Sequence, residues 1–223
     1  MGSGVIRKIT FSVVDPSAAL EESRDARSRE TRARFLAKAM TAGAAVVTGG
    51  VVVGGFPRSA FSKASPAQDL QVLNVLLLLE YVQAAFYREA NARGALKGEV
   101  QEFAETVGGH EDEHVDFIKG VLGAKARAKP RTAFGQATRN QRTFVAAAIA
   151  LEDLAVTAYN GQATNVTRKT LAPAATIVSV EARHAAWIRD IGGRLPAIAA
   201  VDKAVGEAKL LAGLRKSGLR SSP

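Results

Sequence analysis

Cysteine is absent from this chain of 223 residues. Disulfide bonds, thiolate chemistry and sulfur-ligated metals are therefore excluded, and so is a lipid anchor attached to cysteine. Any metal ion must be bound by nitrogen and oxygen atoms. Aromatic residues make up only 6% of the chain, and none alternates with basic residues as a platform for single-stranded nucleic acid would require. We therefore expect no nucleic-acid partner, although the net charge is +9.

The first 64 residues differ from the rest and form an N-terminal extension. They contain ten Lys/Arg and five Asp/Glu, whereas residues 65–223 contain twenty and sixteen. A basic stretch at 32–38 is followed by an uncharged apolar run at 39–56 and then by small residues. This layout is typical of an export signal, and "RARFL" is similar to a twin-arginine signal in which Ala33 replaces the second arginine. We expect a periplasmic or extracellular protein, with membrane anchoring through this segment as the alternative.

The remainder, a domain at 65–223, has helical periodicity and no alternating runs of the kind that form strands. The pattern predicts helices at 67–92, 97–122, 136–160, 173–192 and 196–213. Pro66, Pro173 and Pro196 would each lie in a first helical turn, where proline is tolerated. The connection at 123–135 is long enough to run the length of a helix. We therefore predict an all-α fold: a four-helix bundle at 66–192 with a crossover between its second and third helices, followed by a short fifth helix.

Four glutamates and two histidines stand out within the predicted bundle. Glu111 and His114 are three residues apart, which places them on one face of a helix, and Glu181 and His184 repeat this spacing. Glu80 and Glu152 each lie in the most apolar part of a helix, where a carboxylate without a partner would cost several kcal/mol. Few lysines or arginines share these faces. Two divalent cations would balance the four carboxylates.

The same residues form an internal repeat. Glu80 and Glu152 are 72 residues apart, and both the two E-x-x-H glutamates and the two histidines are separated by 70. Tyr87 and Tyr159 also correspond, since each follows its glutamate by seven residues. The chain thus reads as two helix pairs, each offering a glutamate followed by E-x-x-H.

With this pattern, the sequence resembles the ferritin-like superfamily of dimetal carboxylate proteins over about 66–192. It is most similar to the single-domain, often exported branch that includes desiccation-related proteins. The resemblance implies that Glu111 and Glu181 bridge two metal ions and that Glu80 and Glu152 are terminal carboxylates. It further implies that His114 and His184 each bind one metal. We expect Tyr87 and Tyr159 to pack behind the ligands rather than to take part in redox chemistry.

A different site is suggested by "HEDEH", because His110 and His114 also fit H-E-x-x-H, the helix motif of zinc proteases. That interpretation leaves Glu181 and His184 unexplained. In the second copy of the repeat, Val180 stands where His110 stands in the first. We therefore expect His110 to be a residue at the rim of the site with no part in binding metal.

Two classes of function remain open. By the resemblance, the protein is an oxidoreductase that acts on oxygen, peroxide or Fe(II) through two metal ions, as a ferroxidase, peroxidase or catalase would. Ligand type alone does not distinguish iron, manganese and zinc. The resemblance favours the two redox-capable metals, with iron as the first choice, manganese as the second and zinc as the least expected. The alternative is a non-enzymatic envelope protein with a protective or scaffold role in stress or desiccation. The sequence leaves formation of a homo-oligomer open.

Overall fold

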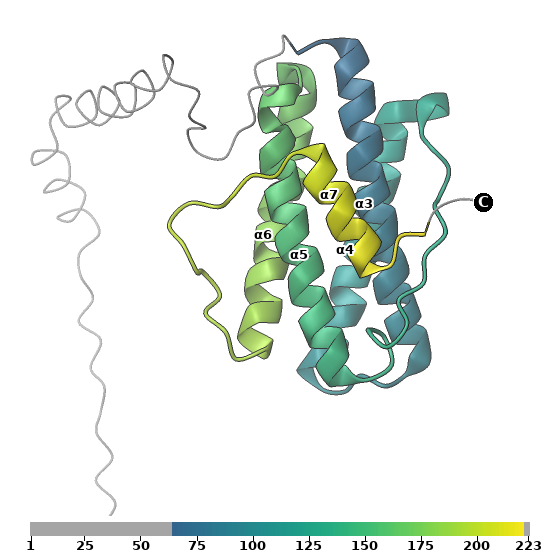
Figure 1. Ribbon diagram of the computed structural model, residues 1–223, viewed down its shortest axis with the longest axis vertical. Helices are drawn as coiled ribbons and strands as arrows, with labels where there is room; N and C mark the ends of the chain where they lie inside the picture. The colour runs from purple at the N-terminus through teal and green to yellow at the C-terminus, as the bar shows by residue number, and fades with distance from the viewer. Residues whose placement is uncertain (1–63, 221–223) are drawn as a thin grey trace, which may run out of the picture. The chain divides into compact units, whose positions relative to one another are not determined.

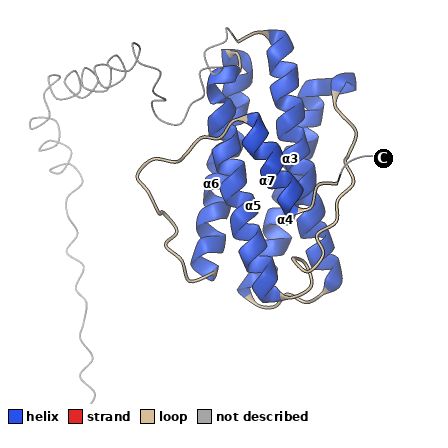
Figure 2. Ribbon diagram, in the orientation of Figure 1, coloured by secondary structure: helices blue, strands red, loops and turns tan. Residues whose placement is uncertain are grey.

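The computed structural model of the protein describes residues 64–220, and within that range it contains α-helices and no β-strand (Figure 2). The predicted export signal, with its apolar run at 39–56, lies outside the described residues. The helices are α3 (Pro66–Arg93), α4 (Glu99–Leu122), α5 (Gln141–Gln162), α6 (Arg168–Ile191) and α7 (Glu207–Ser217). Two short 3-10 turns, η2 (Gly123–Lys125) and η3 (Ala163–Asn165), follow α4 and α5.

The first four of these helices form two hairpins of antiparallel helices, α3 with α4 and α5 with α6 (Figure 1). Helix α3 packs mainly on α4, and α5 packs mainly on α6, while contacts between α4 and α6 and between α3 and α5 close the bundle. Helix α7 lies across α5 and α3 and inserts Leu210 and Leu214, both fully buried. The predicted all-α bundle with a short additional C-terminal helix is thereby confirmed.

The segment between α4 and α5 runs along the outside of α3 (Figure 1). Asn74, near the start of α3, accepts from Arg127 N at 2.8 Å and donates to Lys125 O at 3.1 Å. Near the end of α3, Glu89 accepts from the Thr138 hydroxyl at 2.6 Å. The segment therefore follows α3 from one end to the other and leaves α4 and α5 parallel, which is the predicted crossover.

Helix α3 is the most enclosed element of the bundle. It is apolar on nearly all sides, and α4, α5, α7 and the crossover segment all pack against it. Among the described residues it is also the one helix long and apolar enough to span a membrane, but 78% of that apolar window is buried inside the protein. A helix that is hydrophobic all round is typical of a protein core.

The helix boundaries agree with the prediction within two residues for α3 and α4, whereas α5, α6 and α7 begin at other residues than predicted. Ser65 caps α3 by accepting from Gln68 N at 3.2 Å, with Pro66 in the first turn. Helix α5 begins at Gln141 rather than 136, because the Asn140 side chain caps it by accepting from Thr143 N at 3.0 Å. Pro196 does not begin a helix: the chain is irregular from 194 to 206, and α7 begins only at Glu207.

Helix α6 also begins earlier than predicted, at Arg168, so that Pro173 lies inside it. The carboxylate of Asp69, from the start of α3, accepts from Thr167 N at 2.8 Å and from the Thr170 hydroxyl at 2.7 Å. These hydrogen bonds lower the pKa of Asp69 although burial acts in the opposite direction. A cap supplied by a distant helix stabilises this first turn and fixes the ends of α3 and α6 to each other.

Candidate metal centre

Each of the four bundle helices brings part of the predicted site to the centre of the bundle. Helices α3 and α5 each contribute one glutamate, whereas α4 and α6 each contribute a glutamate and a histidine one turn apart. All of these side chains are buried: the four carboxylates have no exposed surface and the two histidines are at most 8% exposed. The six residues are Glu80, Glu111, His114, Glu152, Glu181 and His184.

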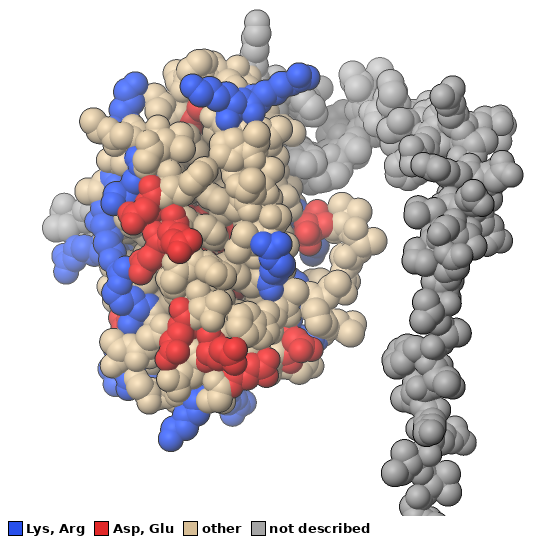
Figure 3. All heavy atoms as spheres, turned by 180° about the vertical axis from the view of Figure 1, so that it is seen from behind, with Lys and Arg blue, Asp and Glu red and all other residues tan. Residues whose placement is uncertain are grey.

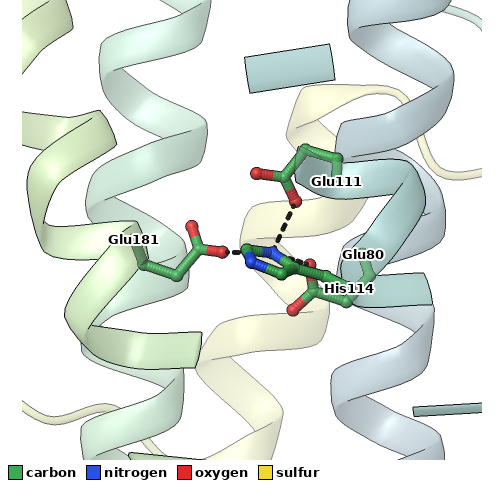
Figure 4. A group of neighbouring side chains, drawn as sticks. All are labelled: Glu80, Glu111, His114 and Glu181. Atoms are coloured by element: carbon green, nitrogen blue, oxygen red, sulfur yellow. Dashed lines mark ion pairs between the residues drawn. The ribbon is translucent and has the colours of Figure 1, made fainter. Parts of the chain in front are cut away.

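One half of the site is arranged around His114 (Figure 4). Its Nδ1 atom lies 3.0 Å from Glu181 Oε1, 3.5 Å from Glu80 Oε2 and 3.5 Å from Glu111 Oε2. Three helices therefore contribute to this half, and one of its carboxylates comes from the opposite hairpin. These four side chains could hold one ion, since one ligand atom from each lies within 4.8 Å of the others.

The other half is arranged in the same way around His184. Its Nδ1 atom lies 3.2 Å from Glu111 Oε1, 3.4 Å from Glu152 Oε2 and 3.8 Å from Glu181 Oε2. These four residues form the second group that could hold an ion. Glu111 and Glu181 thus belong to both groups and direct one oxygen toward each half, as bridging carboxylates would.

The atoms that face the centre of the site form no hydrogen bond of good geometry and approach only one another, as imidazole–carboxylate pairs 3.0 to 3.8 Å apart. They are both oxygens of Glu111 and of Glu181, one oxygen of Glu80 and of Glu152, and Nδ1 of each histidine. Buried polar atoms in proteins are almost always hydrogen-bonded. No lysine or arginine pairs with these carboxylates within residues 64–220. The donor set therefore suits two cations with nitrogen and oxygen ligands, four donor atoms for each.

Two tyrosines hold the outer oxygens of the terminal carboxylates in a crossed pattern. The Tyr159 hydroxyl on α5 donates to Glu80 Oε1 on α3, and the Tyr87 hydroxyl on α3 donates to Glu152 Oε1 on α5. Gln83 Nε2 also donates to Glu152 Oε1, at 3.1 Å. Each of these carboxylates consequently has one oxygen fixed by the bundle and the other directed at the centre.

The two tyrosines were expected behind the ligands, but their exchange across the bundle was not visible in the sequence. Gln83 was missed altogether. A signal for it existed, because it is a polar residue one turn after Glu80 in an otherwise apolar stretch.

Burial and crowding of like charges change the acidity of the carboxylates. Burial raises the pKa of Glu111 well above its usual range, and repulsion from Glu181 raises it further. Burial also raises the pKa of Glu152 to about 7. The pKa of Glu181 is lowered to about 2, because attraction to the neighbouring His114 and His184 outweighs its burial. The pKa values of Glu111 and Glu181 are therefore shifted in opposite directions, so that Glu111 is the more basic of the two.

The histidines compensate the remaining negative charge. Burial would lower their pKa values, but the surrounding carboxylates outweigh it, and the pKa rises to about 12 for His114 and to about 11 for His184. Both imidazoles are therefore protonated at neutral pH in the metal-free protein. Protons thus occupy the positions that metal ions would take.

A pocket of about 450 Å³ opens between α4 and α6 next to the two histidines. His110 and Val180 lie at its edge, and Trp187 closes one side by packing on Phe103. This pocket opens beside the candidate site, since His114 and His184 both line it. The face of the protein opposite α7 carries interspersed acidic and basic side chains (Figure 3).

His110 is exposed, as a rim residue should be, but it has a contact that the sequence did not predict. Its Nδ1 atom lies 2.9 Å from Nε2 of His184, and the two rings are nearly parallel, 14° apart. Neither group of side chains that could hold an ion includes His110. The arrangement expected of a zinc-protease helix is therefore not formed within the described residues.

Comparison with protein families gives one match, to a family model described as a ferritin-like domain, over residues 68–194. The matched range includes all six residues of the site. Comparison with curated proteins gave no match.

Proposed function

The chain belongs to the ferritin-like domain family, and we propose that its buried cluster binds two metal ions and acts as the redox centre of an oxidoreductase. The observation that carries this proposal is the set of buried, inward-facing ligand atoms at the centre of the bundle, which approach only one another. They divide into two groups of four, and each group combines three carboxylate oxygens with one imidazole nitrogen. A core that served only packing would not bury four carboxylates without a lysine or arginine beside them.

In the proposed centre, Glu111 and Glu181 hold both ions, while Glu80 with His114 and Glu152 with His184 each complete one side. Iron or manganese at this centre would supply the redox chemistry: oxygen or peroxide would accept electrons from the reduced ions, and Fe(II), where it is the substrate, would be the electron donor. Iron is the first choice and manganese the second.

The chain itself contributes position, proton control and shielding. The tyrosine hydroxyls and Gln83 fix the terminal carboxylates, so that their inward oxygens need little rearrangement when an ion binds. The apolar helices around the site exclude bulk water. The pocket between α4 and α6 gives a small oxidant access from the side of the two histidines.

The test is metal analysis of protein from its native host, and of metal-free protein reloaded under competition among iron, manganese and zinc. The expected result is two ions of iron or manganese per chain, with consumption of oxygen or peroxide. Glu111→Ala should abolish binding of both ions. Asp112→Asn is the matched control, because Asp112 is adjacent in sequence but pairs with Arg88 on the surface.

Absence of bound metal, or zinc alone without turnover, would refute the oxidoreductase and favour the protective or scaffold role. We further propose that the protein acts outside the cytoplasm, as its N-terminal segment suggests. The sequence of the mature N-terminus in the native host tests this: a start near Ser65 or Gln68 is expected, and an intact Met1 on cytoplasmic protein would contradict it.

A further inference from the structure

The two halves of the site differ at one position of the repeat. The distance of 70 residues that relates Glu111 to Glu181 and His114 to His184 also relates His110 to Val180. Both side chains border the same pocket, but only His110 can form a hydrogen bond. The symmetry of the site is therefore broken on the side that faces solvent.

The presence of His110 in place of a second valine directly affects one histidine of the site, His184. Nδ1 of His184 faces the carboxylates, while its Nε2 lies 2.9 Å from Nδ1 of His110. A neutral imidazole carries its proton on one nitrogen only. When Nδ1 of His184 binds a metal, the proton is on Nε2, from where it can be donated to His110.

A hydrogen bond to the second ring nitrogen of a metal-binding histidine affects metal affinity in proteins generally. A histidine that binds a metal usually donates its other N–H to an acceptor, which fixes the tautomer and the ring orientation. Loss of the acceptor typically lowers metal affinity about 10- to 100-fold. Val180 offers no acceptor to His114, so the two halves are not equally supported.

We propose that His110 is a positioning residue for His184, which makes the His184 half the tighter of two inequivalent metal sites. This inference rests on the proposed binding of two metal ions. His110 touches neither group of inward-facing atoms and acts only through the ring of His184. The two ions are then bound in order, first beside His184 and next beside His114.

Titration of metal-free protein with Co²⁺, followed by its visible absorption and by calorimetry, tests the inference. The wild-type protein should bind two ions in separate phases. His110→Ala should weaken the tight phase about 10- to 100-fold, so that the two phases merge. His110→Asn should restore the tight phase, because its side-chain oxygen can accept the proton of Nε2. Val180→His should strengthen the weak phase by offering His114 a similar partner.

The outcomes separate this inference from the proposed function. Failure of the wild-type protein to bind cobalt would overturn both. Two bound ions with unchanged phases in His110→Ala would overturn the positioning role alone. A weakened tight phase that His110→Asn does not restore would also overturn it, since loss of the side chain rather than of the acceptor would be responsible. Because His110 is exposed, the metal-free His110 variants should have the same denaturation midpoint as the wild type.

Discussion

Loading the centre with metal should release several protons from each chain. In the metal-free protein at pH 7, His114 and His184 are protonated, since their pKa values are about 12 and about 11. Glu111 holds a further proton, and Glu152, with a pKa of about 7, is half protonated. All of these groups must lose their protons to offer every inward-facing atom to a metal. Binding of two ions at pH 7 should therefore release roughly three to four protons.

This number has a consequence for affinity. Each proton released makes binding about tenfold stronger per unit rise in pH, or about 1.4 kcal/mol. The product of the two association constants should then increase about 1,000- to 10,000-fold between pH 6.5 and 7.5. The steep dependence arises because burial and the crowded carboxylates retain protons that an exposed cluster would already have lost.

Calorimetry of Mn²⁺ binding in two buffers with different ionisation enthalpies measures the proton release directly. Asp112→Asn should release as many protons as the wild type, because Asp112 forms a surface ion pair with Arg88. Glu152→Gln should release fewer. Release of less than one proton per chain, or an affinity independent of pH, would show that protons do not occupy the centre and would refute this reasoning.

Three other perturbations test separate parts of the structure. Metal-free protein should lose stability as the pH rises. Protonation of His114 and His184 stabilises the fold fully below pH 6.5, and this stabilisation is lost as the pH rises toward their pKa values of about 12 and about 11. Ionisation of Glu152 in the buried site lowers the stability further between pH 4.5 and about 7. Thermal unfolding at pH 6 and pH 9 measures this, and an equal or higher melting temperature at pH 9 would contradict it. Tyr159→Phe should weaken metal binding about 10- to 100-fold, because it removes the donor to Glu80 Oε1; Tyr81→Phe, which loses only a bond to the crossover segment, is the control for the titration. Gly161→Ala should cost roughly 3 kcal/mol in chemical denaturation, because its Cβ would lie 1.8 Å from Val205 O, and a wild-type midpoint would refute the close approach.

The bundle and the residues at its centre could be predicted because the spacing of the glutamates and histidines is repeated along the chain. Glu80 and Glu152 were identifiable because a carboxylate in an apolar stretch needs a partner, and the two E-x-x-H motifs supplied one. Spacing along a helix fixes the face on which a side chain lies, so the convergence of the six residues could be anticipated.

The remaining features depend on contacts between distant segments. The early start of α6 follows from Asp69, which is 98 residues away from Thr167 along the chain. The crossed tyrosine bonds depend on the relative height of α3 and α5, and helical periodicity does not specify that height. His110 was given no part because it lacks a counterpart in the repeat, yet the bundle brings it within 2.9 Å of His184. Pro196 is compatible with a helix start but occupies irregular chain.

Each group of side chains that could hold an ion takes residues from both helical hairpins, so metal retention would depend on correct packing of the two hairpins. Neither hairpin holds a full set of four donors for either ion, because Glu181 completes the half around His114 and Glu111 completes the half around His184. The tyrosine bonds cross the same boundary. Separation of the hairpins would therefore remove at least one donor from each of the two candidate ion sites. Bound metal would in turn slow the separation of the hairpins. Metal content would then measure how many chains have docked their two halves in the correct register.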